Sequence, residues 1–177
     1  MSLPSLYISA AMNVQLVPFR LRVLKALSAC IEGVNPDNGH HHDLRGCVFR
    51  GRLRFGSTDP LPMISILEAP IPQDSNNGSG ENTGNVGGWE LLVQGFAPDD
   101  RANPSDPAHH MMAEVKSVLV KEKRRSRGND ILGMRGRIIS MNVGQGSVRP
   151  PEDPSSEAFF WLTLRLQVAE DLEQPYK

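Results

Sequence analysis

The chain of 177 residues is long enough to bury the core of one domain and short for two. Its 19 basic and 20 acidic residues leave a net charge of −1, which excludes the strong global field of a highly basic nucleic-acid binder. Its apolar runs fall short of the roughly 18 residues of a membrane span, and 16 glycines with 14 prolines predict long loops.

The first residues are predicted to be an arm outside the folded domain. Residues 1–13 contain an apolar stretch interrupted by Pro4 and Asn13, and they lack the basic start of a signal peptide. Met12 is an alternative translation start. We therefore divide the chain into an N-terminal arm, residues 1–13, and one domain, residues 14–177.

Two amphipathic helices are predicted, at residues 17–32 and 107–125, because apolar side chains recur there at three- and four-residue steps. Asp106 is the expected N-cap of the second helix, and the basic run KEKRRSR suits its C-terminal end. A shorter helical turn is expected at residues 131–134. The predicted apolar stripes consist of Val17, Leu21, Leu24, Leu27 and Ile31 in the first helix, and of Ala108, Met111, Met112, Val115, Val118 and Leu119 in the second.

The segment VFRGRLRF belongs to the most distinctive of five predicted strands, residues 47–55. Its side chains alternate, so that Arg50, Arg52 and Arg54 share one face and apolar side chains share the other. A row of three arginines suits ion pairs with acidic residues of a neighbouring chain. The alternative is a solvated row whose aliphatic stems cover apolar surface.

The remaining strands complete an α+β fold. Three strands in series favour antiparallel pairing with helices on one face. We therefore expect a mainly antiparallel sheet of about five strands with two helices packed on one face. The polar tracts at residues 73–88 and 144–157 are predicted to be long loops, and the first is expected to be mobile. The other four strands are predicted at residues 63–69, 89–97, 137–143 and 158–170.

Motifs for catalysis or metal binding are weak. His40, His41, His42 and Asp43 are metal-ligand types, but adjacent side chains diverge, so we expect solvated loop histidines. The glycine-rich tracts lack the context of a phosphate-binding loop, no nucleophile is spaced near a base, and the two cysteines are expected to be reduced. We predict no enzyme activity, no cofactor and no metal, with a metal-dependent enzyme built on these histidines as an alternative.

A second basic group lies at the end of the second predicted helix. Lys121, Lys123, Arg124 and Arg125 would suit phosphate, but neither a nucleic-acid-binding signature nor a basic net charge accompanies them. We expect a solvated helix end or a protein interface, with a nucleic-acid-binding module as the alternative. Acidic partners for the arginines on a neighbouring chain are available in the second long loop, namely Glu152, Asp153 and Glu157, and at Asp99 and Asp100.

Four segments succeed one another over most of residues 14–175: FRLRVLKALSACIEGV, VFRGRLRFGSTDPLPMISILEAP, GGWELLVQGF and RPPEDPSSEAFFWLTLRLQVAEDLEQP. Together they resemble the tail terminator (tail completion) proteins of long-tailed double-stranded DNA phages. The resemblance implies a small subunit similar in plan to the phage lambda terminator, without catalysis and without a cofactor.

The resemblance also implies an assembly. The subunits would form a hexameric ring on the last ring of the tail tube, stop tube growth and offer a surface to the head–tail connector protein. DNA would pass through the ring without sequence-specific binding, and no membrane would be involved. The protein would be part of the virion tail or neck, assembled in the host cytoplasm. Another tail or neck component, such as a head–tail joining protein or a tube subunit, is the alternative.

On this interpretation, the two basic groups and the acidic loop form interfaces between subunits or with the tube. The tract 73–88 would become ordered only when it docks on the tube or the connector.

Overall fold

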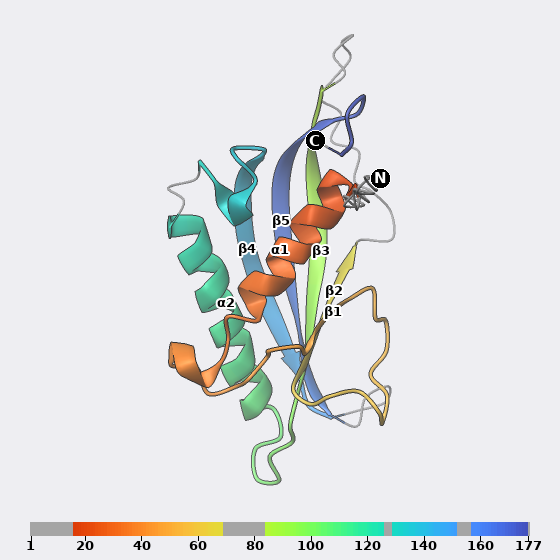
Figure 1. The fold of residues 1–177 in the computed structure, drawn as a ribbon. Helices are drawn as coiled ribbons and strands as arrows, with labels where there is room; N and C mark the ends of the chain where they lie inside the picture. Colours follow the sequence, from red (N-terminus) through yellow and green to blue (C-terminus); the bar gives the residue numbers. More distant parts are fainter. Residues whose placement is uncertain (1–15, 69–83, 126–128, 152–156, 177) are drawn as a thin grey trace, which may run out of the picture.

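Two α-helices lie on one face of a five-stranded sheet in the computed structural model (Figure 1). The structure describes residues 16–68, 84–125, 129–151 and 157–176, so the predicted N-terminal arm lies outside the described residues. The predicted α+β fold is confirmed. The elements are α1 (Phe19–Ile31), η1 (Pro36–Asn38), β1 (Val48–Arg50), β2 (Met63–Glu68), β3 (Gly84–Ala97), α2 (Asp106–Arg125), η2 (Ile131–Gly133), β4 (Ile138–Arg149) and β5 (Ala158–Asp171).

The strand order in the sheet is β1-β2-β3-β5-β4. The pairs β2–β3, β3–β5 and β4–β5 are antiparallel, as expected, but β1 and β2 are parallel, with Val48 opposite Ile64. The prediction of antiparallel pairing is therefore wrong for this pair. The chain leaves β1, crosses the side of the sheet opposite the helices, and returns to begin β2 in the same direction, which requires a long connection.

The predicted strand at residues 47–55 is wrong in its second half. β1 ends at Arg50, and Gly51 takes a positive φ of 77°, a conformation that glycine adopts without the steric cost of a Cβ. Two other strands are longer than predicted, because residues 84–88 belong to β3 and residues 144–149 belong to β4. Both extensions pair with β5 or lie beside it, and backbone pairing needs no apolar side chains.

The predicted mobility and docking of the tract 73–88 lie largely outside the described residues, since the structure describes only the part from residue 84 onward. Residues 84–88 are in a strand, so for them the prediction of a loop is wrong. The strand predicted at 63–69 is confirmed over residues 63–68, and the helical turn predicted at 131–134 is present as η2.

The helices bury an apolar core between themselves and the sheet. In α2 the predicted stripe is confirmed, with Met112 only partly buried at its edge. In α1 the prediction is partly wrong, because Leu21 is 37% exposed while Phe19 and Val23 are buried. The buried face of α1 is thus rotated toward the steps Phe19, Val23, Leu27 and Ile31, which are four residues apart.

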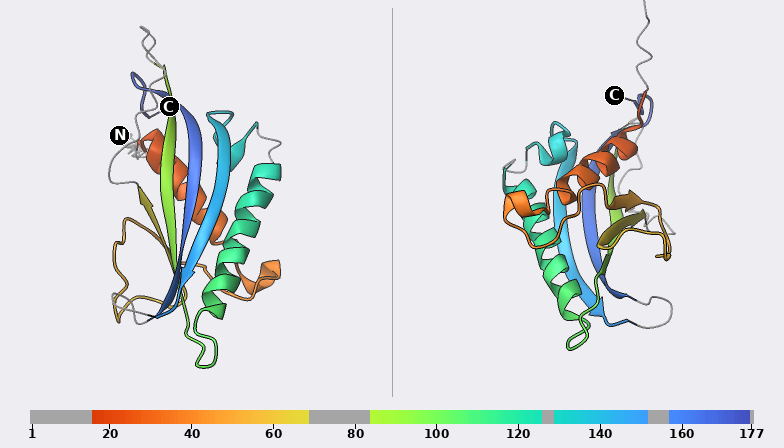
Figure 2. Two further views of the ribbon diagram at one scale, coloured as in Figure 1. Left: turned by 180° about the vertical axis from the view of Figure 1, so that it is seen from behind. Right: turned by 60° about the horizontal axis from the view of Figure 1, so that its bottom comes forward.

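The helix-facing side of β5 carries the centre of the core. Five alternating side chains of β5 on this side are all buried: Phe160, Leu162, Leu164, Leu166 and Val168. Figure 2 shows the opposite side of the sheet in its left view, with α1 behind the strands. No helix in the described part of the chain is both long and apolar enough to cross a membrane.

Gly95 of β3 leaves room for a fully buried aromatic ring of this core. It lies directly opposite Phe160, which is fully buried. A Cβ at position 95 would stand 2.2 Å from Phe160 Cε1 and 2.8 Å from Ile64 Cδ1. Because real atoms do not approach so closely, the ring of Phe160 would have to leave its place.

Replacing Gly95 by alanine is therefore expected to lower the free energy of unfolding by about 1–3 kcal/mol. Urea denaturation followed by circular dichroism measures the loss. Gly56→Ala is the matched control, since the nearest atom to a Cβ there is Asp59 Oδ2 at 3.7 Å, an ordinary contact. Its effect is expected to stay within about 0.5 kcal/mol, and equal losses in both variants would contradict the packing argument.

Candidate interaction surface

Residues 51–62, here called the strap, connect β1 to β2 across the side of the sheet that carries no helix (Figure 2). Phe55 stacks on Phe96 of β3, with ring centroids 5.1 Å apart and an angle of 24° between the rings. Phe96 and Phe159 form a small second core with Met63, and Phe49 and Phe55 pack against it. The strap therefore covers one end of this face, and among the described residues no further segment is seen to cover the rest of it.

Two hollows lie beside the strap on the open face, and Leu53 lines both of them. The larger has a volume of about 600 Å³ and the smaller about 320 Å³. Leu53 is 77% exposed and Trp161 is 39% exposed, so apolar groups face solvent here. We call the two hollows together the groove. Its lining consists of Leu53, Arg54, Phe55, Gln94, Phe96, Phe159 and Trp161 in the larger hollow, and of Leu53, Leu67, Glu68, Glu90, Leu91, Leu92 and Thr163 in the smaller.

The predicted row of arginines does not exist, because β1 ends at Arg50 and the turn at Gly51 breaks the alternation of side chains. Arg50 points to the helix side of the sheet and donates from Nη1 to Ser28 Oγ of α1 at 2.9 Å. Arg52 forms an ion pair with Asp59 of the strap, and its guanidinium carbon lies 3.6 Å from the centre of the Phe49 ring. Only Arg54 lines the groove. The three side chains thus have three separate surroundings within one chain.

The basic end of α2 is partly occupied by contacts within the chain. Arg125 donates from Nε and Nη2 to the carboxylate of Glu122, at 2.9 Å each, and this bond holds the pKa of Glu122 below its usual value. Lys123 donates to Asn142 Oδ1 of β4 at 3.4 Å. Lys121 and Arg124 are exposed. This group lies at the end of α2 and does not join the arginines of the strap (Figure 1).

Two of the three acidic residues predicted as partners in the second long loop lie outside the described residues. These two are Glu152 and Asp153, whereas Glu157 is half-buried just before β5. The sequence analysis did not predict the groove. The available signal was the pair Phe159 and Trp161, two large aromatic residues on the side of β5 that also carries polar residues.

The prediction that the loop histidines are solvated is wrong for His42, which is only 6% exposed. Its Nδ1 lies 2.7 Å from Glu114 Oε2 of α2, while the backbone N–H of His41 donates to Glu114 Oε1 at 2.5 Å. His40 Nδ1 is 3.8 Å from the same carboxylate. Glu114, which no sequence motif distinguished, therefore fastens the loop after α1 to α2.

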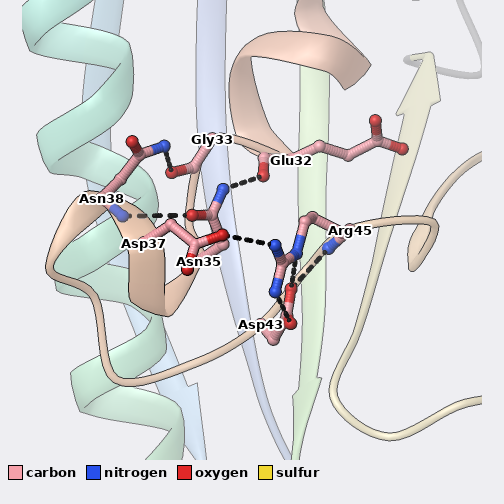
Figure 3. A network of polar contacts seen from close by, with 7 residues as sticks. All are labelled: Glu32, Gly33, Asn35, Asp37, Asn38, Asp43 and Arg45. Atoms are coloured by element: carbon pink, nitrogen blue, oxygen red, sulfur yellow. Dashed lines mark hydrogen bonds and ion pairs between the residues drawn. The ribbon is translucent and has the colours of Figure 1, made fainter.

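A network of polar contacts shapes the rest of this loop (Figure 3). Asn35 accepts from the backbone N–H of Asn38 at 3.1 Å and donates to the carbonyl of Glu32 at 3.1 Å. Arg45 bridges Asp43, at 2.6 Å, and Asp37, at 2.7 Å. The bond from Arg45 lowers the pKa of Asp43, which is thus committed to an ion pair and does not join the histidines.

Neither a metal site nor a reactive thiol is evident in the described residues. In that part of the chain, no group of three or more His, Cys, Asp or Glu side chains is placed to hold a metal ion. Burial, with a smaller contribution from the charge of Glu122, raises the pKa of Cys30 to about 12. Cys30 and Cys47 are not disulfide-bonded. The groove is therefore the feature that calls for a partner.

Comparison of the sequence with models of known protein families gave no match, and comparison with curated proteins gave no significant match.

The contact between Glu114 and the histidine loop should make the stability of the fold depend on pH. Burial opposes the ionisation of Glu114, but hydrogen bonds from His41 and His42 outweigh it and lower its pKa from 4.5. A lowered carboxylate pKa adds stability that is present above the pKa of the unfolded chain and is lost as the pH falls through the folded pKa. Glu114→Gln should therefore lower the free energy of unfolding at pH 7 by about 1–2 kcal/mol. The free energy of unfolding should also decrease less in the variant than in the wild type as the pH is lowered.

Urea unfolding at several pH values from about 3 to 7, a range that covers the titration of carboxylates, measures both effects. Glu32→Gln is the control, since Glu32 is a half-buried carboxylate near the same loop for which neither a hydrogen bond nor an ion pair of the side chain is seen in the described residues. A Glu114→Gln variant with the wild-type pH profile would contradict the role given to this carboxylate.

The separation of the arginines can be tested by truncation. Arg52→Ala removes an ion pair and a cation–π contact and is expected to cost about 1 kcal/mol of unfolding free energy. Arg54→Ala, whose side chain faces the groove, should stay within about 0.5 kcal/mol. Urea denaturation of both variants measures the difference, and equal effects would indicate that the strap does not depend on Arg52.

Proposed function

We propose that this protein is a structural virion protein that closes a phage tail tube as a ring and joins the tail to the head connector. The observation that carries the proposal is the open face of the sheet. Trp161 and Leu53 are exposed beside hollows of about 600 and 320 Å³, although two helices cover the other face completely enough to bury its apolar residues. Exposed apolar surface of this kind marks an interface with another macromolecule.

The resemblance of the sequence to tail terminators supports the identity of that macromolecule. The four segments that carry the resemblance form α1, β1 with the strap and β2, most of β3, and β5, which together build the groove and the sheet behind it. The α+β architecture also agrees with the small subunit that the resemblance implies.

A closed ring needs two different surfaces on each subunit, because each copy meets one neighbour on each side. The groove is one candidate for such a surface, and the basic end of α2, on a different part of the molecule, is available for a contact with the tube or the connector. Of the ten residues predicted at interfaces, the exposed Arg54, Lys121 and Arg124 are the best placed to meet another chain. Arg50 and Arg52 have partners within the chain and would instead support the fold.

The ring would surround the DNA path without reading its sequence. The partners would be further copies of the chain, the tail tube protein and the head–tail connector protein. The protein would act in the virion tail or neck after assembly in the host cytoplasm, and its contribution would be mechanical, without a chemical reaction.

Negative-stain electron microscopy of the purified protein, alone and added to growing tail tubes, tests the proposal. We expect rings or single subunits alone, tubes capped at one end in the mixture, and shorter tubes as more protein is added. Long hollow rods formed by the protein alone would instead indicate a tube subunit. Steeply salt-dependent binding of DNA without any effect on tubes would indicate a nucleic-acid-binding module.

A further inference from the structure

Two places far apart on the molecule each carry a pair of exposed apolar side chains. One is the groove, with Leu53 and Trp161. The other is the segment that follows β5, residues 171–176, where Leu172 is 60% exposed and Tyr176 is 50% exposed. Trp161 lies near the start of β5 and Asp171 at its end, so the rise per residue separates them by roughly 30 Å. The two places therefore cannot meet within one chain.

The segment 171–176 has a defined shape. Asp171 Oδ1 accepts hydrogen bonds from the backbone N–H groups of Glu173, at 3.0 Å, and Gln174, at 3.1 Å, which makes a tight turn around Leu172. The carbonyl of Pro175 accepts a hydrogen bond from the N–H of Phe19, at 2.8 Å, and so joins the segment to the start of α1. Leu172 is thus held out toward solvent between two acidic residues.

The larger hollow of the groove has the opposite charge, whereas the smaller hollow is lined by Glu68, which accepts from Trp89 Nε1 at 3.2 Å, and by Glu90, which pairs with Arg165 at 2.7 Å. Arg54 lines the larger hollow, and Arg149 of β4 lies opposite Phe159, another lining residue, in the register of β4 and β5. Arg54 and Arg149 are both exposed. The larger hollow, with Arg54 in its lining and Arg149 next to it, therefore suits a partner whose apolar side chain is flanked by carboxylates.

We propose that the groove of one copy of this chain binds the segment 171–176 of a second copy. Leu172 would enter the hollow beside Leu53 and Trp161, and Glu173 would face Arg54. The contact joins two different surfaces, so it is heterologous and leaves one free groove and one free segment on every pair, which allows a ring to grow and close. This inference rests on the proposed function, for which it supplies the contact between subunits.

Leu53→Asp and Leu172→Asp test the contact from its two sides. Sedimentation velocity of the wild-type protein over a range of concentrations is expected to show self-association. Each variant should raise the dissociation constant at least about tenfold, because a carboxylate would be buried in an apolar hollow. Ile139→Asp is the matched control, since Ile139 is apolar, 46% exposed and outside both places, and it should associate as the wild type does.

A mixture of the two variants makes the test specific. The Leu53→Asp chain keeps its segment and the Leu172→Asp chain keeps its groove, so the mixture should form dimers and stop there. Charge reversal gives an independent measurement: Arg54→Glu and Glu173→Lys should each weaken association, and both together in one chain should restore it. Circular dichroism and urea unfolding of every variant confirm that the fold is intact.

Several results would overturn the inference: a wild-type chain that stays monomeric, association unaffected by both aspartate variants, or a mixture of them that forms no dimers. The proposed function can fail separately. Wild-type and Leu172→Asp proteins that cap tubes equally well would refute this contact and leave the capping role. Association that depends on both places, without capping of tubes, would support the contact and refute that role.

Discussion

The antiparallel pairing of β3 with β5 is the interaction on which the rest of the molecule depends. It extends from Gly84 opposite Asp171 to Ala97 opposite Ala158, with β2 paired to β3, β4 paired to β5, and β1 added at the outer edge of β2. The same pairing places Phe160 over Gly95 and sets the inward residues of β5 against both helices. Loss of this register by one residue would turn the apolar side of β5 to solvent.

A sheet of this width has two faces, and the two helices cover only one of them. The strap brings Phe55 to the second face and seals it around Phe96 and Phe159, which leaves the groove beside it. The turn at Gly51 is what directs the strap there, since it ends β1 after Arg50. The open face is thus a consequence of chain topology, and its exposed tryptophan is the reason to look for a protein partner.

Polar residues in this chain mostly join segments to one another. Glu114 fastens the histidine loop to α2, Glu122 connects the end of α2 to η2 through the N–H of Leu132, and Arg20 of α1 pairs with Glu170 of β5. Each contact links residues that lie far apart or on different elements, so each favours one arrangement of the helices on the sheet. The groove and the segment 171–176 instead present exposed apolar side chains, and they are the places proposed for contacts between chains.

The sequence by itself determined the two helices, the approximate positions of the strands and the α+β class, because side-chain periodicity is a local property. It misplaced the arginines of residues 50–54, since one glycine with a positive φ breaks the alternation on which that prediction depended. Only the tertiary structure decided that β1 and β2 are parallel, that Glu114 meets the histidines, and that Leu53 stands beside Trp161. These features join residues distant in the chain, and their partners are selected by the packing of the whole domain, which no local pattern encodes.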